Sequence, residues 1–156
     1  MRKALSYLLC VGVGAALTLT VAAQQSSREA NEVIEITKAE WESLMAKKAS
    51  AAVKNVANDC TMWVPDFPNR IDGKTGIYNL REAESQGTGN LILAEMANEK
   101  VQRYGNVAIL TYNFMGMTKD KDGSVEPMTA KSTRVYVNQS GQWMLVHANF
   151  APIAAE

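Results

Sequence analysis

The stretch KSTRVYVNQSGQWMLVHANF, residues 131–150, decides the fold. Two runs rich in β-branched and aromatic residues flank the turn Gln139-Ser140-Gly141, a pattern typical of a β-hairpin. We therefore predict strands over Lys131–Asn138 and Gln142–Phe150. The last third of the chain then folds as sheet.

Immediately upstream, Val107–Thr118 predicts a long strand that ends in the hairpin loop Lys119–Gly123. Both faces of this strand carry large apolar side chains, whereas a strand with one wet face alternates apolar and polar residues. We expect helices to cover one face and a second copy of the chain to cover the other. The predicted partner is thus a homodimer mate on the outer sheet face.

Further upstream, Leu91–Met96 predicts a strand that Val101–Tyr104 continues or restarts. A short helix is predicted over Lys74–Ser85, with Thr75 as its candidate cap. The proline-ended segment Asp59–Pro65 is predicted to be extended.

The first helix is predicted from Thr37-Lys38-Ala39-Glu40, which has the spacing of a capping box. Apolar residues follow at spacings of three and four, from Trp41 to Val56, so the helix should run to about Ala57. Helices followed by hairpin-joined strands indicate an α+β domain with helices on one face of a sheet.

The N-terminus has the features of an export signal. Arg2 and Lys3 precede the apolar stretch Leu8–Val21, and Val21-Ala22-Ala23 offers small residues for cleavage before Gln24. We predict a signal peptide (1–23), a flexible leader (24–32) and one domain (33–153). The product would be periplasmic or secreted, without a membrane partner after cleavage. An uncleaved anchor over Ala4–Ala23 is the alternative, because about 20 residues span a bilayer.

Charge and cysteine content narrow the function classes. Without Arg2 and Lys3 the chain keeps fourteen basic and sixteen acidic residues, and no basic run is long enough to follow a phosphate backbone. Nucleic acid is therefore not an expected partner. Cys60 would be the only mature cysteine, which excludes an internal disulfide and favours a buried, inert thiol.

The C-terminal hairpin resembles that of the nuclear transport factor 2-like superfamily. The resemblance is carried by Ser132-Thr133-Arg134-Val135-Tyr136, Gly141-Gln142-Trp143 and Val146-His147, and it is closest to the SnoaL-like and calcium/calmodulin-dependent protein kinase II association-domain branch. It covers about Val33 to Pro152. Asp59 with Trp63-Val64-Pro65, Gly73, and Gly105-Asn106-Val107-Ala108 also agree with that branch.

The resemblance implies a cone-like curved antiparallel sheet packed on a long N-terminal helix and one shorter helix, a cystatin-like roll with a pocket at its open end. It also implies frequent dimers through the outer sheet face. Arg134 matches a pocket arginine that holds small carboxylates in association-domain relatives. Their other two pocket arginines correspond to positions near Thr111 and at Phe150, so this chain departs from the pattern. The alternative for Arg134 is a structural pair with a carboxylate such as Asp59.

Candidate catalytic residues are Asp59, as a general base, and Tyr112. Candidate ligand-binding residues share an aromatic or cationic side chain expected near the pocket: Arg134, Trp63, Tyr78, Tyr112 and Phe150. His147 is the only histidine. Because side chains alternate between the two faces of a strand, His147 lies on the face opposite Phe150 and should point outward if Phe150 points inward. We expect no metal, because a multi-histidine site is excluded and the Asp120–Glu126 spacing fails for calcium. We expect no cofactor, since the sequence has no glycine-rich phosphate loop.

The sequence thus favours an exported domain that binds a small organic ligand or assembles, without catalysis. The alternative is a cofactor-independent enzyme of the SnoaL or ketosteroid-isomerase type that performs acid/base chemistry on a small hydrophobic substrate. A protein-interaction module without a ligand is a third class, and it predicts a filled interior rather than a cavity.

Overall fold

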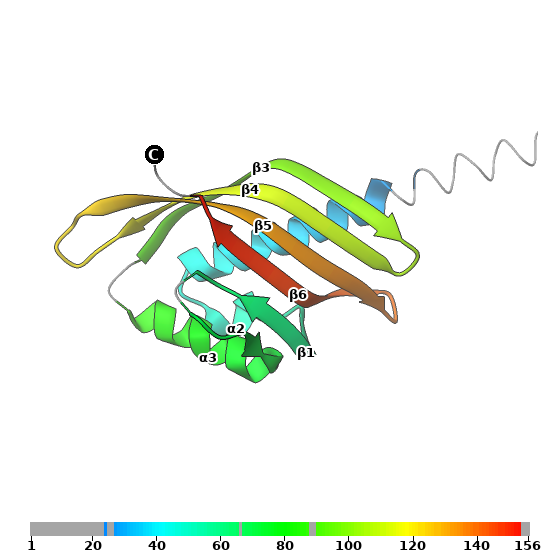
Figure 1. Cartoon of the computed structure of the whole chain (residues 1–156), viewed down its shortest axis with the longest axis horizontal. Coiled ribbons are helices and arrows are strands. Elements are labelled where there is room, and N and C mark those ends of the chain that lie inside the picture. The colour runs from blue at the N-terminus through cyan, green and yellow to red at the C-terminus, as the bar shows by residue number, and fades with distance from the viewer. Residues whose placement is uncertain (1–23, 25–26, 66, 88–89, 154–156) are drawn as a thin grey trace, which may run out of the picture.

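A six-stranded sheet forms the body of the computed structural model, which describes residues 24, 27–65, 67–87 and 90–153 (Figure 1). The strand order is β2-β1-β6-β5-β4-β3. All neighbouring strands are antiparallel except β1 and β6, which run parallel. The strands are β1 (Val56–Trp63), β2 (Ile71–Asp72), β3 (Asn90–Tyr104), β4 (Val107–Lys119), β5 (Val125–Gln139) and β6 (Gln142–Pro152).

The helices lie on one face of this sheet. A long N-terminal helix includes residues 27–45 and runs under the curved strands β3 to β6, while α3 (Gly73–Gln86) lies beside β1 (Figure 1). The short α2 (Ala49–Ala52) joins the long helix to β1. The predicted α+β class, with a curved sheet on a long and a shorter helix, is confirmed. Among the residues that the structure describes, no helix is both long and apolar enough to cross a bilayer.

The long helix begins earlier and ends earlier than predicted. Residues 27–32, expected in a flexible leader, are helical, and Glu29 forms an ion pair with Arg103 of β3. The predicted signal peptide (1–23) lies outside the described residues. At the other end the helix stops at residue 45, because Lys47 adopts a left-handed backbone with φ 56°.

The predicted capping box at Thr37 is wrong, because Thr37 lies inside the helix. Its hydroxyl donates to Val33 O at 2.9 Å, one turn back. The phenol of Tyr136 on β5 lies 2.8 Å from Thr37 Oγ1. Because the Thr37 hydroxyl hydrogen is already donated to Val33 O, the phenol of Tyr136 is the donor to Thr37. Burial raises the pKa of Tyr136 to about 12, which keeps the phenol protonated. The predicted helix to Ala57 is also wrong, although most of its apolar stripe is buried through α2 and the start of β1.

The start of β5 and the cap of α3 differ from the sequence-based prediction. β5 starts at Val125, six residues before the expected Lys131, and its extra residues pair with β4 in a projecting hairpin arm (Figure 1). Pro127 within this segment argues against a strand in sequence-based reasoning. α3 matches its predicted range within one residue at each end, but it starts after Asp72 without a side-chain cap, so Thr75 is not the cap.

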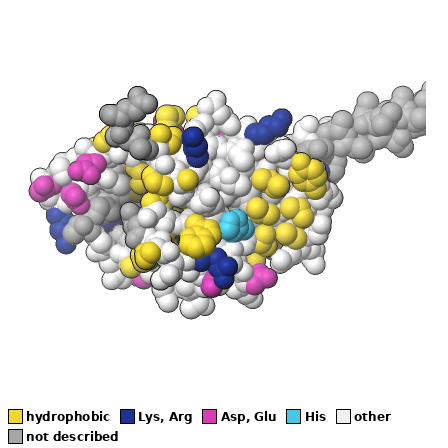
Figure 2. Space-filling model, in the orientation of Figure 1, with side chains coloured by type: hydrophobic (Ala, Val, Ile, Leu, Met, Phe, Trp, Pro, Cys, Tyr) yellow, Lys and Arg dark blue, Asp and Glu magenta, His cyan; other side chains and the backbone are white. Residues whose placement is uncertain are grey.

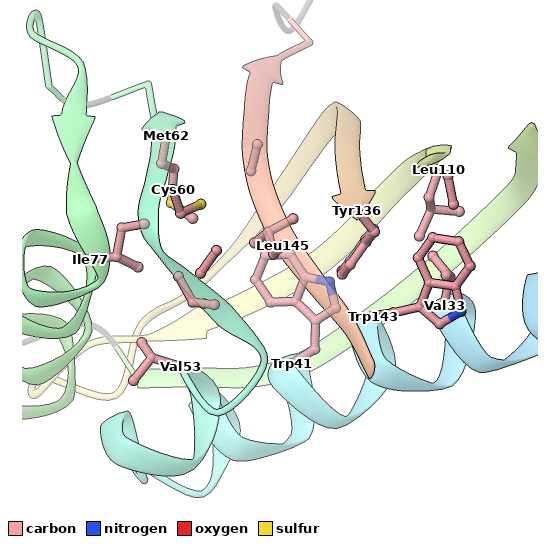
Figure 3. Packing of buried hydrophobic residues seen from close by; sticks show 14 of the residues in the cluster. Val33, Trp41, Val53, Cys60, Met62, Ile77, Leu110, Tyr136, Trp143 and Leu145 are labelled. Atoms are coloured by element: carbon pink, nitrogen blue, oxygen red, sulfur yellow. The ribbon is translucent and has the colours of Figure 1, made fainter. Parts of the chain in front are cut away.

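The core lies between the long helix and the sheet. Trp41 stacks at 4.4 Å from Phe114 and 5.7 Å from Phe150, measured between ring centroids, and Phe114 lies 5.1 Å from Phe150. Figure 3 shows Trp41 and Val33 rising from the helix toward the buried side chains of β5 and β6. These contacts explain why the apolar stripe of the helix faces the sheet.

We predict that Gly116→Ala destabilises the domain. A Cβ at Gly116 would lie 2.6 Å from the Phe114 ring, and Trp41 and Phe150 hold that ring in place. Overpacking of this kind costs about 1–3 kcal/mol of unfolding free energy. Urea denaturation measures it, with Met117→Ala on the exposed face of β4 as the control. Equal stability of both variants would contradict the packing described.

Candidate functional site

A buried ion pair joins the long helix to the sheet. Arg134 on β5 donates from Nη1 to Glu40 Oε2 and from Nη2 to Glu40 Oε1, the latter at 3.3 Å. The Arg134 side chain is 2% exposed and that of Glu40 is 8% exposed. This two-pronged geometry is the one that a guanidinium and a carboxylate favour.

Aromatic groups complete the surroundings of Arg134. Its Nε donates to the Tyr112 hydroxyl at 3.0 Å, and the Trp41 indole donates to the same oxygen at 3.1 Å. The guanidinium carbon lies 5.3 Å from the Trp41 ring centroid. Burial disfavours the charge of Arg134, but Glu40, and then Tyr112 and Tyr136, raise its pKa well above the ordinary value. Arg134 is therefore a permanent buried cation.

A second buried arginine, Arg81 on α3, shares the same carboxylate. Its Nη2 lies 3.5 Å from Glu40 Oε1, and its Nη1 donates to Glu84 Oε2 at 3.0 Å. Glu84 is half exposed, whereas Arg81 is 7% exposed. The Nε atom of Arg81 is buried without a hydrogen-bond partner. Two buried guanidinium groups thus share one buried carboxylate.

Arg134 and Arg81 line a cavity of about 300 Å³. Two further polar lining atoms, Ser132 Oγ and Asn90 Oδ1, are also buried without a hydrogen-bond partner in the structure. Buried polar atoms are nearly always hydrogen-bonded, and each exception calls for an explanation. Three residues that line the cavity, Arg81, Ser132 and Asn90, thus carry buried polar atoms without a hydrogen-bond partner.

The amino-acid sequence matches a known protein family. The family model described as the calcium/calmodulin dependent protein kinase II association domain matches residues 29–153. The chain belongs to this association-domain family. Among curated proteins, none matches the chain.

Solved structures agree with the association-domain fold. The association domain of C. elegans CaMKII superposes with a TM-score of 0.66 at 17% identity, over 80% of this chain and 96% of that one. A nuclear transport factor 2-like superfamily protein from Salmonella enterica gives 0.71 at 17% identity, over 83% and 94%. The Chlamydamonas reinhardtii CamKII hub homology domain gives 0.67 at 17% identity, over 81% and 99%. These likenesses establish the fold.

The association-domain structure brings together only some of the predicted site residues. Arg134 and Phe150 line the cavity, and Tyr112 lies behind Arg134 as its hydrogen-bond partner. Trp63 and Tyr78 are 42% and 36% exposed and lie outside the cavity lining.

Asp59 is exposed on β1 and does not pair with Arg134, whose partner is Glu40. The alternative of a structural arginine paired with a carboxylate is therefore borne out, but the partner is Glu40 and not Asp59. As a candidate base, Asp59 is not placed to reach a molecule held in the cavity.

His147 lies on the other side of β6 from the cavity, as its strand parity predicts. Its Nδ1 is 2.8 Å from the Thr61 hydroxyl, and the imidazole is visible at the surface beside hydrophobic side chains (Figure 2). Within the described parts of the chain, no group of three or more His, Cys, Asp or Glu residues could hold a metal ion.

The sequence reasoning missed Glu40 and Arg81, although their positions carry a signal. Ile77, Leu80 and Arg81 are spaced as positions i, i+3 and i+4 of a helix, and such positions share one face. Arg81 therefore lies on the buried face of α3. Glu40 lies next to Trp41 and three residues after Thr37, on the stripe that faces the sheet. A charged residue on a buried helical stripe indicates a buried partner or a site.

We predict that Cys60 is unreactive in the folded protein. Burial, and then the negative charge of Glu40, raises the pKa of its thiol to about 12. At pH 8 only about one thiol in ten thousand would then be ionised. A chain with Cys10→Ser leaves Cys60 as the single thiol. An aromatic disulfide reagent should label this chain only after unfolding, and labelling at the rate of a free thiol would contradict the burial.

Proposed function

We propose that this association-domain protein binds a small organic carboxylate in the cavity, without catalysis. One observation carries the proposal: Arg134 and Arg81 share Glu40, and the site keeps unpaired donors. Among the described residues, the buried charged side chains are Arg134, Arg81 and Glu40, and the half-exposed Glu84 is the second carboxylate bound to Arg81. A carboxylate would compete with Glu84 for Arg81 and accept from Arg81 Nε and Ser132 Oγ.

The alternative of acid/base catalysis has less support. Glu84 is the only carboxyl group among the described residues that line the cavity, and it is half exposed and bound to Arg81. A general base must lie within hydrogen-bond reach of the proton it removes. Asp59 and His147 lie outside the lining, so the geometry favours binding.

Export is part of the same proposal. It rests on Arg2 and Lys3, on the apolar run Leu8–Val21 and on the small residues before Gln24. The binding domain would then act in the periplasm or outside the cell.

We predict that butanoate raises the melting temperature of the protein and that butanamide, its neutral analogue, does not. A ligand that binds only the folded state stabilises it by an amount that grows with the logarithm of the ligand concentration over Kd. Arg81→Gln should weaken butanoate binding about tenfold or more, since a hydrogen bond to a charged group contributes about 1.5–3 kcal/mol. Calorimetric titration measures the affinities.

Glu84→Gln is the matched control, because it removes a carboxylate that competes for Arg81 Nη1. It should strengthen butanoate binding while Arg81→Gln weakens it. Equal shifts with butanoate and butanamide, or no shift with either, would contradict carboxylate recognition.

We further propose that the protein forms a homodimer through the outer sheet face. Outward-facing residues form two adjoining rows across β4, β5 and β6: Val107, Val137 and Met144 in one, and Ile109, Val135 and His147 in the next. Each is only partly buried in the single chain. Figure 2 shows hydrophobic side chains gathered beside the histidine. The names of the similar structures, association domain and hub homology domain, support self-association.

We predict that Val137→Lys converts a dimer into a monomer. The lysine would bring an unpaired charge into the centre of an apolar interface, at a cost of several kcal/mol. Sedimentation equilibrium measures the mass of each species. Ala83→Lys, at an exposed position of α3, is the control and should leave the mass unchanged. A monomeric parent chain would contradict the proposed dimer.

A further inference from the structure

We infer that His147 makes the proposed dimer sensitive to pH, so that two copies associate at neutral pH and separate when the imidazole gains a proton. This inference rests on the proposed dimer and adds its regulation. The place of the histidine on the outer sheet face and the side chains around it carry the inference.

His147 lies near the middle of a row of residues that crosses the whole sheet. It pairs with Val135 of β5 on one side and with Thr61 of β1 on the other. The strand register extends this row from β2 to β3: Asp72, Thr61, His147, Val135, Ile109 and Gln102. A second copy that covers the outer face would therefore cover the imidazole as well.

The adjoining row on this face is apolar. It continues from Tyr104 of β3 through Val107 and Val137 to Met144 of β6. Tyr104 is 61% exposed, and the other three side chains are part-buried in the single chain. Figure 2 shows hydrophobic side chains on either side of the imidazole. Burial of this surface favours association as long as the ring beside it is neutral.

A hydrogen bond holds the imidazole in this position. Its Nδ1 lies 2.8 Å from the hydroxyl of Thr61, the residue with which His147 pairs on β1. A threonine hydroxyl can donate or accept, so the bond is compatible with both protonation states of the ring. Acid would therefore add a charge at a fixed position on the face.

The nearest charged groups on this face come from β1 and β2. Asp59 lies two residues before Thr61, and strand alternation sets the two on one face. Asp72 pairs with Thr61, but Arg70 donates to both of its carboxylate oxygens, at 2.6 and 3.2 Å. All three charged side chains are exposed, so water and salt screen them. They offset little of a positive charge on the ring.

The described residues that flank the histidine on the other strands are uncharged. They are Asn149 on β6, and Thr133 and Val135 on β5. Glu40 and Arg134 are buried on the opposite face of the sheet. A protonated ring would thus enter the interface as a charge without a close partner, which opposes association.

The direction of the pH effect follows from proton linkage. Histidine changes its charge between pH 5 and 8. The separate copies bind the proton, whereas the dimer excludes it, so acid favours the separate copies and the dimer is favoured above this range. A symmetric dimer contains the imidazole twice. The Kd of dissociation should therefore rise by up to about a hundredfold for each pH unit below this range.

The experiment is sedimentation equilibrium of the full chain at about pH 7.5 and about pH 5.5 in the same salt. The Kd of the parent dimer should be on the order of a hundredfold higher at the lower pH. His147→Gln keeps a neutral polar side chain, and its two Kd values should agree within about threefold. His147→Lys places a permanent charge at the same position and should be monomeric at both pH values.

Asp59→Asn is the matched control, because it removes the carboxylate nearest to the histidine on β1. It should keep the rise in Kd that the parent shows. Circular dichroism at both pH values checks that each variant is folded.

The outcomes separate this inference from the dimer proposal. A parent chain that is monomeric at pH 7.5 would overturn both. A parent dimer with the same Kd at both pH values would overturn the role of His147 and leave the dimer standing. So would a His147→Gln variant that dissociates in acid as the parent does.

Discussion

The buried ion pair between Glu40 and Arg134 is the constraint on which the rest of the structure depends. Removing two charges from water is costly, and the cost is offset only if each charge finds its partner in good geometry. The long helix must therefore present Glu40 to β5 at one position and one rotation. That placement also stacks Trp41 on Phe114 and brings Thr37 to Tyr136. Polar pairing thus sets the register of the helix, and apolar burial supplies the driving force.

The same pair explains why a cavity lies beside it. Arg81 reaches Glu40 from α3, so helix, sheet and α3 converge on one carboxylate without filling the space between them. Buried polar atoms without a hydrogen-bond partner remain on Arg81, Ser132 and Asn90, which line that space. An interior of this kind is suited to binding, whereas a pure assembly domain would be expected to fill it. In the proposed dimer, self-association would use the opposite face of the sheet, so binding and assembly need not compete.

The fold was largely predictable from the sequence, and the site only in part. The hairpin of β5 and β6 has clear turn chemistry, and strand parity correctly placed Arg134, Tyr136 and His147. The partner of Arg134 was not predictable in this way, because Glu40 lies 94 positions away and its local sequence also fits a helix cap. The end of the long helix was missed because α2 and β1 continue the same apolar face through a left-handed residue, Lys47. Local patterns identify which faces are buried, whereas tertiary contacts decide which charges meet.

A double-mutant cycle on Glu40→Gln and Arg134→Gln tests the central claim most directly. The free energies of unfolding of the parent, both single variants and the double variant would come from urea denaturation. The account predicts a coupling energy of about 2–3 kcal/mol, because each single variant leaves a charge buried with a poorer partner. Single effects that add within about 0.5 kcal/mol would show that the two side chains do not interact, and would contradict the account.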